Sequence, residues 1–475
     1  MKKVAFVYGN FNIFHPGHLR LLKFAKESSD YLIVGVNSDK LANNPSLLEE
    51  DIRLESIKST SYVDEVFLLN EDVLEYIKRR KPDILVKGKE FENRDNAEEE
   101  VMKAYGGKIL FSSGEIGFSS LNLLQKDFEI SFSNLNHDAS FIKRHKIEKT
   151  KLIEYVNKFS NLNILVIGDT IIDEYITCDA IGMSQEDPTI VVTPISNKKF
   201  IGGAAIVASH AKTLGARVSY ISVLGEDNNF DFTQAYLNEL GIKTCLLSDR
   251  TRPTTLKQRF RAQNKTLLRV NHLKQHNISK DLEAKILEYI SKDESNYDLI
   301  IFSDFSYGVL TKNIIENITA YAKEKAILMV ADSQSSSQIG DISKFIDMDI
   351  VTPTEREIRL SINDFESGLV ILSEKLHKKS NPKYIFTTLG SEGILIYNSN
   401  KDELLTDNIQ ALNTNAKDVS GAGDSLLTCS SMAKVVGANV WESAYLGSIA
   451  AAIQVSRVGN IPIKKYELIE EINFK

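Results

Sequence analysis

The chain has few of the residues that would place it among secreted, zinc-binding or membrane proteins. Its 475 residues include three cysteines, Cys178, Cys245 and Cys429, which lie far apart and in no C-x-x-C arrangement. This spacing indicates neither a disulfide framework nor a zinc site. No stretch approaches the roughly 20 apolar residues of a membrane-spanning helix. These absences predict a protein of a reducing, cytoplasmic compartment.

An excess of positive charge is also missing. The formal net charge is -7, so no basic field is present to gather nucleic acid, and anionic substrates must be held by local groups. The opening MKKVAFVYGN has a basic pair, but its apolar run has only the length of a strand, which is not typical of a signal peptide. We therefore expect small-molecule partners, with neither nucleic acid nor a membrane among them.

What the sequence does contain is ordinary globular composition, 43% hydrophobic and 25% charged, over a length that predicts two or three domains. In residues 1–130, strand-like runs alternate with helical runs, which predicts a doubly wound α/β domain with a parallel sheet. Residues 131–159 are polar and predict a linker with a lead-in helix, and residues 160–475 restart the α/β alternation. The stretches 175–200 and 251–272 are rich in β-branched residues and predict a small appended sheet.

The run GNFNIFHPGHLRLLKFAKE, residues 9–27, lies where a predicted strand meets a predicted helix. His15 and His18 flank Pro16 and Gly17 there, beside the free N–H groups of a helix N-terminus, which attract anions. Two imidazoles can donate to a phosphate, and Gly17 removes the side chain that would keep a nucleotide away. One capping histidine and one exposed histidine explain the same pattern, so the motif alone leaves both interpretations open.

A second glycine cluster, DVSGAGDSLLTC, begins at residue 418. Gly421, Ala422 and Gly423 form a loop with almost no side chains before a helical run, so main-chain N–H groups there would cradle a phosphoryl group. Asp424 is placed to take a proton from an attacking hydroxyl, a contribution of about 100- to 10,000-fold in rate. A glycine-rich turn with Asp424 as the helix cap would have the same residues.

Further motifs accompany this cluster in the same half of the chain. GDTIIDEY places Asp169 and Asp173 after a strand, where carboxylates accept hydrogen bonds from sugar hydroxyls. Glu357 in PTEREIR suits a magnesium-bound water. The next strand-to-helix turn and the run TLGSEG supply glycines and a threonine for substrate and nucleotide: Gly202, Gly203, Thr388, Gly390 and Gly393. Each motif alone is more typical of structure than of function, but chance explains their common order poorly.

Taken together, the quoted motifs resemble two families. Residues 1–125 resemble the cytidylyltransferase-type nucleotidyltransferases through GNFNIFHPGH, VGVNSDK, EEDIRLESI, ILVKGKEF and GEIGFSS. Residues 160–475 resemble the ribokinase-type sugar kinases through GDTIID, GGAA, LGED, PTERE and DVSGAGD. The whole chain is similar to the family of bifunctional heptose 7-phosphate kinases and heptose 1-phosphate adenylyltransferases, which makes ADP-heptose for bacterial lipopolysaccharide.

For the first half, the resemblance implies transfer of a nucleotide from ATP to a sugar 1-phosphate with release of pyrophosphate. His15 and His18 would stabilise the charge that builds on the α-phosphate. The other residues implied to bind the nucleotide or a substrate phosphate are Asn10, Phe11, Gly17, Arg53, Lys87, Ser119 and Ser120.

For the second half, the resemblance implies phosphorylation of a sugar phosphate, with heptose 7-phosphate as the leading substrate, at the expense of ATP. Asp424 would be the base and Glu357 would hold Mg²⁺ through water. The nucleotide would lie against Thr388, Gly390, Gly393 and the glycine cluster, and the sugar against Asp169, Asp173, Gly202 and Gly203. A monovalent cation and a homodimer through the small β lid are further implications.

Several positions depart from the bifunctional family and leave alternatives open. The familiar enzyme carries its kinase first, whereas the transferase leads here. Ile206 stands where an asparagine is usual and is expected to face the sugar, and Ser306 or Tyr307 and Gln334 replace lysines. The open alternatives are the same chemistry on another sugar or with CTP, and a sugar-binding regulatory module without turnover.

Overall fold

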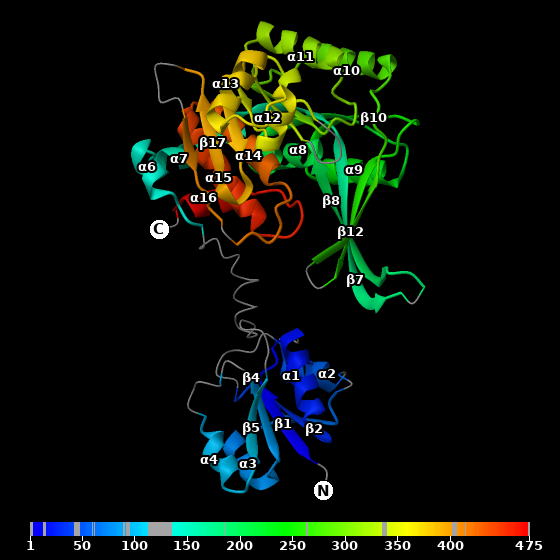
Figure 1. Cartoon of the computed structure of the whole chain (residues 1–475), viewed down its shortest axis with the longest axis vertical. Helices are drawn as coiled ribbons and strands as arrows, with labels where there is room; N and C mark the ends of the chain where they lie inside the picture. The colour runs from blue at the N-terminus through cyan, green and yellow to red at the C-terminus, as the bar shows by residue number, and fades with distance from the viewer. Residues whose placement is uncertain are drawn as a thin grey trace. The chain divides into compact units, whose positions relative to one another are not determined.

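The structure is a computed structural model of the whole chain (Figure 1). It describes residues 3–12, 16–41, 48–58, 60, 62–88, 91, 96–112, 135–184, 186–262, 265–334, 340–400, 406–413 and 415–473. The chain forms two compact units, unit 1 (Met1–Ser131) and unit 2 (Phe132–Lys475). The domain limits expected at residues 130 and 160 stay predictions.

Unit 1 is built on a five-stranded sheet whose strands are all parallel, in the order β3-β2-β1-β4-β5. The strands are β1 (Val4–Gly9), β2 (Tyr31–Asn37), β3 (Glu65–Leu69), β4 (Ile84–Gly88) and β5 (Lys108–Ser112). The helices are α1 (Pro16–Glu27), α2 (Glu50–Lys58), α3 (Val73–Arg80) and α4 (Glu98–Lys103). Ala5 and Val7 pack with α1 and α2, whereas Phe6 packs with α3 and α4. Both faces are thus covered, which confirms the predicted doubly wound sheet.

The main sheet of unit 2 has nine strands in the order β10-β9-β6-β13-β14-β15-β16-β17-β18. They are β6 (Asn163–Gly168), β9 (Arg217–Leu224), β10 (Lys243–Ser248), β13 (Leu299–Asp304), β14 (Leu328–Ser333), β15 (Ile350–Val351), β16 (Tyr384–Thr388), β17 (Ile394–Asn398) and β18 (Thr406–Ile409). The strands are parallel from β10 to β16, and β17 and β18 add antiparallel pairs at one edge. The predicted parallel sheet is confirmed, with this antiparallel extension.

Helices cover both faces of the main sheet. One layer contains α6 (Ala139–Arg144), α7 (Lys149–Lys158), α8 (Ala204–Thr213), α14 (Ala422–Val435), α15 (Val440–Val455) and α16 (Lys465–Asn473). The other contains α10 (Lys280–Lys292), α11 (Lys312–Glu324), α12 (Glu355–Ile362) and α13 (Leu369–Ser380), and α9 (Asn228–Glu239) joins β9 to β10. Along β6, Ile164 and Val166 pack in the first layer and Leu165 and Ile167 in the second. None of the described helices has the length and apolar character needed to cross a bilayer.

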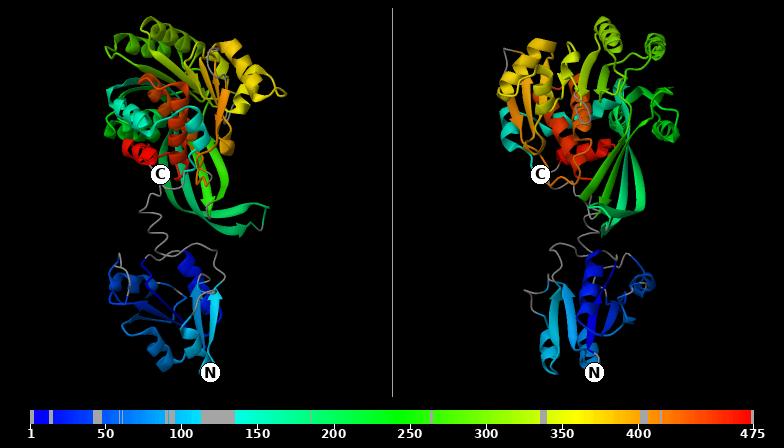
Figure 2. Two further views of the ribbon diagram at one scale, coloured as in Figure 1. Left: turned by 90° about the vertical axis from the view of Figure 1, so that its left-hand side faces the viewer. Right: turned by 45° about the vertical axis from the view of Figure 1, so that its right-hand side comes forward.

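Four strands form a separate small sheet, the lid, in the order β12-β11-β7-β8. They are β7 (Thr170–Met183), β8 (Ile190–Gly203), β11 (Thr255–Ala262) and β12 (Lys265–His272), and they project from the body of unit 2 (Figures 1 and 2). The appended sheet predicted from the β-branched stretches is confirmed. Large apolar side chains are exposed on it, namely Met183, Ile190, Val191, Ile195 and Leu268. The homodimer through the lid stays a prediction.

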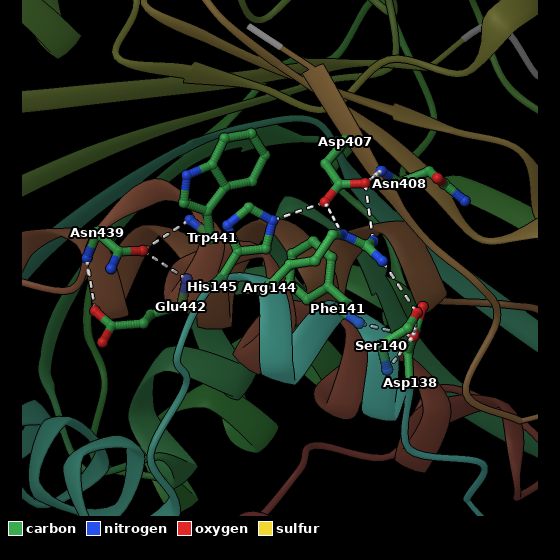
Figure 3. A network of polar contacts seen from close by, with 10 residues as sticks. All are labelled: Asp138, Ser140, Phe141, Arg144, His145, Asp407, Asn408, Asn439, Trp441 and Glu442. Atoms are coloured by element: carbon green, nitrogen blue, oxygen red, sulfur yellow. Dashed lines mark hydrogen bonds and ion pairs between the residues drawn. The ribbon is translucent and has the colours of Figure 1, made fainter. Parts of the chain in front are cut away.

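The start of unit 2 is clamped to its body by a polar network around α6 (Figure 3). Arg144 Nε and His145 Nε2 lie 2.9 and 2.7 Å from Asp407 Oδ2, on β18. The His145 ring stacks on the Trp441 ring of α15, with centroids 4.3 Å apart and an interplanar angle of 17°. The clamp therefore joins a helix near the seam to an edge strand and a helix from late in the sequence.

We predict that Asp407→Asn destabilises unit 2 at neutral pH. Burial alone would raise the pKa of Asp407, but hydrogen bonds from Arg144 and His145 outweigh burial and hold this pKa below its ordinary value. Such a carboxylate stabilises the fold above its unfolded-state pKa of about 3.9, and this stability is lost as the pH falls through the lower folded-state pKa. Urea unfolding at pH 7 should show a loss of about 1–3 kcal/mol.

The difference between wild type and Asp407→Asn should shrink below about pH 4, where both side chains become neutral. The matched control is Asp187→Asn, because Asp187 is exposed in the loop between β7 and β8. An equal loss in the two variants, or a difference that does not shrink below about pH 4, would contradict the clamp.

Candidate active sites

The carboxyl ends of β1 and β4 meet where the strand order of unit 1 reverses, which is the usual ligand site of such a sheet. Asn10 and Phe11 follow β1 there, with Phe11 at a φ of 48°. Gly17 lies in the first turn of α1, and the His18 ring stands edge-on to the Phe11 ring with centroids 5.0 Å apart. The structure thus brings these predicted residues together. The predicted residues outside the described ranges are His15, Ser119 and Ser120.

The Arg53 side chain holds the segment after β1 in place through hydrogen bonds to main-chain carbonyl oxygens. The side chain is fully buried and donates to the carbonyl oxygens of Asn10 at 2.7 Å, Asn37 at 2.8 Å and Leu48 at 3.0 Å. Its Nη2 lies 2.5 Å from Asp39 Oδ1. A buried guanidinium needs such partners, because an unpaired buried charge is very costly. In this structure Arg53 therefore positions the ends of β1 and β2, and its contact with a phosphate stays a prediction.

Lys87 lies on β4 at the same edge and is held by a buried acid. Its Nζ lies 2.8 Å from Glu98 Oε1, which also accepts a hydrogen bond from the Tyr8 hydroxyl. The ammonium lies over the Phe91 ring at 4.9 Å. Burial would raise the pKa of Glu98, but the hydrogen bonds from Lys87 and Tyr8 lower it below its ordinary value. Lys87 is thus a fixed cation near the carboxyl end of β4, the strand that pairs with β1.

Unit 2 contains a cavity of about 740 Å³, lined by lid strands β7 and β11, the end of β14 and the starts of α12 and α14. Many residues predicted to form the kinase site line this cavity. They are Asp173, Gly203, Glu357, Thr388, Gly390, Gly393, Gly421, Ala422, Gly423 and Asp424. Two other predicted residues, Asp169 and Gly202, lie outside the lining.

The glycine cluster opens the first turn of α14 toward the cavity. Gly421 adopts a φ of 78°, which favours glycine, and a Cβ there would lie 2.7 Å from Asn460 Oδ1. A Cβ on Gly423, by contrast, would meet none of the described residues within 4 Å. The N–H groups of a first helical turn have no helical partner and attract anions. The turn therefore suits a phosphate.

Asp424 lies in that turn and is 5% exposed. Burial, and then the nearby charge of Asp173, raise the pKa of Asp424 to about 7, while Lys257 acts in the opposite direction. The Gln334 amide donates to Asp424 Oδ1 at 3.4 Å and to Asp332 Oδ2 at 3.3 Å. A carboxyl group with a pKa near the working pH is suited to proton transfer.

Asp332 is a carboxylate in the cavity that lies outside the sequence motifs quoted above. It is 4% exposed, and burial together with the charges of Glu357 and Asp424 raises its pKa well above the ordinary value. It lies near the carboxyl end of β14. The sequence feature that could have identified Asp332 is its place at the end of an apolar strand, because parallel sheets bind ligands at that end of their strands.

Glu357 has a structural partner as well as a place in the cavity. Its Oε2 accepts from the Thr354 N–H at 2.7 Å, and the Thr354 hydroxyl accepts from the Glu357 N–H at 3.2 Å. This reciprocal pair is a capping box that begins α12. The carboxylate is thus fixed in orientation beside Asp332.

Residues at the junction of the lid and the body also line the cavity, Asp173, Arg259 and Asn460 among them. Asp173 Oδ1 lies 3.0 Å from Arg259 Nη2, and Asp173 Oδ2 accepts from Asn460 Nδ2 at 3.1 Å. Gly202 leaves room for this carboxylate, because a Cβ there would lie 2.6 Å from Asp173 Oδ2. Sequence reasoning did not identify Arg259, Lys257 or Asn460, since the first two are placed by strand pairing between distant segments and Asn460 lies in a loop after α15.

Asp169 braces a turn through main-chain hydrogen bonds. Its carboxylate accepts from the N–H groups of Phe305, Tyr307 and Val309 at 2.9, 3.2 and 3.3 Å. Burial and the charge of Asp304 raise the pKa of Asp169 to about 6, although these N–H groups act to lower it. In this structure Asp169 therefore positions the turn after β13, and its contact with sugar hydroxyls stays a prediction.

The expectation that Ile206 faces the sugar is wrong. Its side chain is fully buried in the hydrophobic cluster that includes Ala205 and Leu427, and it does not line the cavity. Residues 204–211 of α8 are all buried, because this helix contacts α14 as well as the main sheet. At a core position the residue type is set by packing. The presence of isoleucine at position 206 therefore does not indicate which sugar the chain binds.

Comparison with protein families finds a match in each unit. Residues 6–111 match the cytidylyltransferase-like family, and residues 161–465 match the pfkB family of carbohydrate kinases. Two curated relatives, each named bifunctional protein HldE, come from Syntrophotalea carbinolica and Pelobacter propionicus. The first is 31% identical over 333 residues, covering 68% of this chain and 66% of the relative. The second is 29% identical over 328 residues, covering 68% and 66%.

The chain therefore spans about two thirds of the length of these curated relatives, 66% in both cases. Among solved structures, the ribokinase from Arabidopsis thaliana complexed with ribose and ATP matches with a TM-score of 0.51 and 16% identity, covering 66% of this chain and 99% of that one. Phosphofructokinase-2 from Escherichia coli, in complex with substrates and products, matches with a TM-score of 0.54 and 14% identity, covering 66% and 98%. These likenesses show a ribokinase-like fold. Because residues 161–465 are more than half of its length, the chain belongs to the pfkB family of carbohydrate kinases.

Proposed function

We propose that unit 2 transfers the γ-phosphoryl group of ATP to a hydroxyl group of a sugar. The observation that carries this proposal is the position of Asp424, a buried carboxyl group with a pKa of about 7 in the open first turn of α14. Asp173 lines the same cavity and is proposed to contact the sugar, and Thr388, Gly390 and Gly393 line it and are proposed to contact the nucleotide. The family match supports the same reaction class.

In the proposed reaction, Asp424 accepts the proton of the attacking hydroxyl while the sugar oxygen forms a bond to the γ-phosphorus. The bond from that phosphorus to the ADP oxygen breaks, and ADP leaves. The N–H groups of Gly421–Asp424 stabilise the charge on the transferring group, since fixed donors at a site of developing charge lower the barrier. Asp173 accepts hydrogen bonds from sugar hydroxyls and orients the one that reacts.

Mg²⁺ fits the carboxylates at the end of β14 and the start of α12. Asp332 and Glu357 are buried and repel each other, an interaction that a divalent cation would relieve. The described residues contain no group of three or more His, Cys, Asp or Glu side chains placed to hold a metal, but Mg²⁺ keeps several waters and needs only one or two carboxylates. When bound, Mg²⁺ would neutralise charge on the nucleotide phosphates. The need for a monovalent cation stays a prediction.

For unit 1, the proposed reaction is transfer of a nucleotidyl group to a sugar 1-phosphate. A phosphate oxygen of the sugar 1-phosphate attacks the α-phosphorus, and pyrophosphate leaves. His18 and the fixed cation Lys87 lie at the switch point of the sheet, where they would stabilise the charge on the α-phosphate. His15 is proposed to act with His18, and the family match supports this reaction class.

Taken together, the two proposed reactions describe a bifunctional enzyme that makes a nucleotide-activated sugar. Heptose 7-phosphate is its leading kinase substrate, and ATP is its nucleotide. The names of the curated relatives support two activities in one chain. The competing proposals are the same chemistry on another sugar or with CTP in place of ATP, and a sugar-binding regulatory module without kinase turnover. Measuring ATP consumption over a panel of sugars and sugar phosphates decides between them, because the regulatory module would consume none.

We predict that the two activities are separable by single substitutions. His18→Ala should abolish pyrophosphate release and leave kinase turnover near that of wild type, because the two sites lie in different units. Asp424→Asn keeps the shape but removes the base, so kinase kcat should fall at least roughly 100-fold while transferase activity persists. Each variant is the control for the other. Parallel loss of both activities in either folded variant would refute separate sites.

The glycines of the α14 turn provide a matched pair. Gly421→Ala should lower the melting temperature, since its Cβ would lie 2.7 Å from Asn460 Oδ1 at a φ of 78°. Gly423→Ala should leave the melting temperature unchanged or higher, because a Cβ there meets no described atom within 4 Å and alanine favours helix. Its Cβ would occupy the phosphate site, so the KM for ATP should rise about tenfold. An unchanged KM would place the phosphate elsewhere.

The kinase should also lose activity in acid. Burial and the charge of Asp173 raise the pKa of Asp424 to about 7, and only the deprotonated form can accept the proton of the hydroxyl. We therefore expect kinase kcat/KM to fall about tenfold per pH unit below an inflection near pH 7. The residual kinase rate of Asp424→Asn is the control, because this variant lacks the titrating carboxyl group and its rate should not show the inflection. A kinase profile that is flat from pH 5.5 to 8 would show that Asp424 is not the base.

A further inference from the structure

Gln454 is a buried polar side chain that the proposed reactions do not use. It lies in the last turn of α15, is fully buried and does not line the cavity. Its Nε2 donates to the carbonyl oxygen of Ser420 at 3.2 Å and to that of Gly459 at 3.0 Å. A side-chain amide has two N–H donors, so these two carbonyl groups use both. Because Ser420 directly precedes Gly421, the N-cap of α14, Gln454 holds the start of the glycine-rich turn.

Asp418 binds the same two residues through their N–H groups. Its Oδ1 accepts from the Ser420 N–H at 3.1 Å, and its Oδ2 accepts from the Gly459 N–H at 3.0 Å. Burial would raise the pKa of Asp418, but hydrogen bonds from the Tyr175 hydroxyl and from these N–H groups outweigh burial and hold this pKa below its ordinary value. Asp418 is therefore a carboxylate at neutral pH, and together with Gln454 it joins the start of α14 to the loop after α15.

These oxygen atoms have the chemistry of a site for a monovalent cation. The carbonyl oxygens of Ser420 and Gly459 and the carboxylate of Asp418 gather by the C-terminal end of α15, which carries partial negative charge. Main-chain carbonyl oxygens can replace the hydration shell of K⁺. The resemblance to the ribokinase-type kinases implies a monovalent cation, yet Gln454 Nε2 already contacts both carbonyl oxygens. A cation that bridged them would have to displace the amide, so the residues present do not fit a bound cation.

The orientation of the Gln454 amide leads to the same conclusion. Its Oε1 is buried and has no donor among the residues that the structure describes. Turning the amide over would place Oε1 against the carbonyl oxygens of Ser420 and Gly459, and three acceptors without a donor repel one another unless a cation lies between them. With Nε2 toward them, both carbonyl oxygens have a donor, and no further group is needed.

We propose that the Gln454 amide takes the place of a monovalent cation beside the α14 turn, so that phosphoryl transfer by unit 2 requires neither K⁺ nor Na⁺. This inference rests on the proposed kinase function of unit 2. Gln454 is a positioning residue, because it acts through the Ser420 carbonyl on the N–H groups of the turn that follows. A donor that is covalently part of the chain is always present, so the shape of the turn does not depend on the salt.

The first test is the cation response of the full chain. Kinase turnover of heptose 7-phosphate, or of the most active sugar in the panel, is measured with Mg²⁺ and the Tris salt of ATP in choline chloride. The measurement is repeated in KCl and in NaCl at equal ionic strength. Wild type should show the same kcat and the same melting temperature in all three salts. A several-fold rise of kcat in KCl or NaCl would overturn the proposal, since the oxygens would then bind a cation.

Two variants of Gln454 should acquire a cation requirement. Gln454→Ala removes the amide, and Gln454→Glu keeps its shape but replaces both donors by a carboxylate. In choline chloride each variant should lower the kinase kcat at least about tenfold, because two buried carbonyl oxygens lose their donors. KCl should restore most of this loss and raise the melting temperature of the variant. Pyrophosphate release should not change, because that reaction is proposed for the other unit.

Ile453→Ala is the matched control for damage to the fold. Ile453 is the neighbour of Gln454 on α15, is 3% exposed and packs in the hydrophobic cluster of the main sheet. Its truncation should lower the melting temperature through a cavity. Because it removes no donor from the carbonyl oxygens, KCl should restore neither its melting temperature nor its kcat.

The possible outcomes separate this inference from the kinase proposal. Gln454 variants that respond to no cation, or that match wild type in choline chloride, would overturn the inference. Melting temperatures need no substrate, so a response to KCl by the variants but not by wild type supports the exchange of amide for cation even where no sugar is phosphorylated. In that case the kinase proposal alone fails. If neither variant folds, the cation response of wild type decides.

Discussion

The burial of Asp424 is the constraint on which the site of unit 2 depends. A carboxylate withdrawn from water favours its protonated form, and the neighbouring charge of Asp173 adds to this effect, so that its pKa reaches about 7. The surrounding structure keeps the ionised form accessible. The first turn of α14 presents N–H groups, Gly421 allows the helix to begin against Asn460, and Lys257 lowers the pKa. A carboxyl group that titrates near neutral pH follows from these opposing effects.

Arg53 and Asp169 are buried charged side chains that hold main-chain segments in place, although the motifs that contain them resemble ligand sites. A local motif therefore does not distinguish a charge that binds a ligand from a charge that binds the main chain. Arg53 binds three carbonyl oxygens and Asp169 accepts from three N–H groups. The partners of Asp169 are more than 130 residues away in the chain, and pairing at that separation leaves no trace in a local motif.

The features that could be predicted from the sequence are those set by local patterning. Apolar runs with turn signals indicated the strands of both sheets, β-branched stretches indicated the lid, and the glycine cluster indicated the open turn at Gly421–Asp424. The burial of Ile206 is a feature that local patterning did not predict. Whether a residue after a glycine turn faces a cavity or the core depends on which helix packs over it, and here α14 covers α8. Asp332 went unnoticed because it stands outside any recognised motif.

The lid shows how strand register can determine chemistry that composition hides. The chain carries a net charge of -7, yet one face of the lid brings cations from the hairpin of β11 and β12 together with a cation from β8, a strand from much earlier in the sequence. A shift of one residue in the pairing of β11 would turn these side chains away from the cavity and bring Gln258 and Phe260 to it. The same pairing places Asp173 beside Arg259, so one register sets both a carboxylate and the cations that line the cavity with it. The positions of these opposite charges are therefore coupled through a single backbone alignment, and a substitution that disturbs the pairing of β7 with β11 affects both.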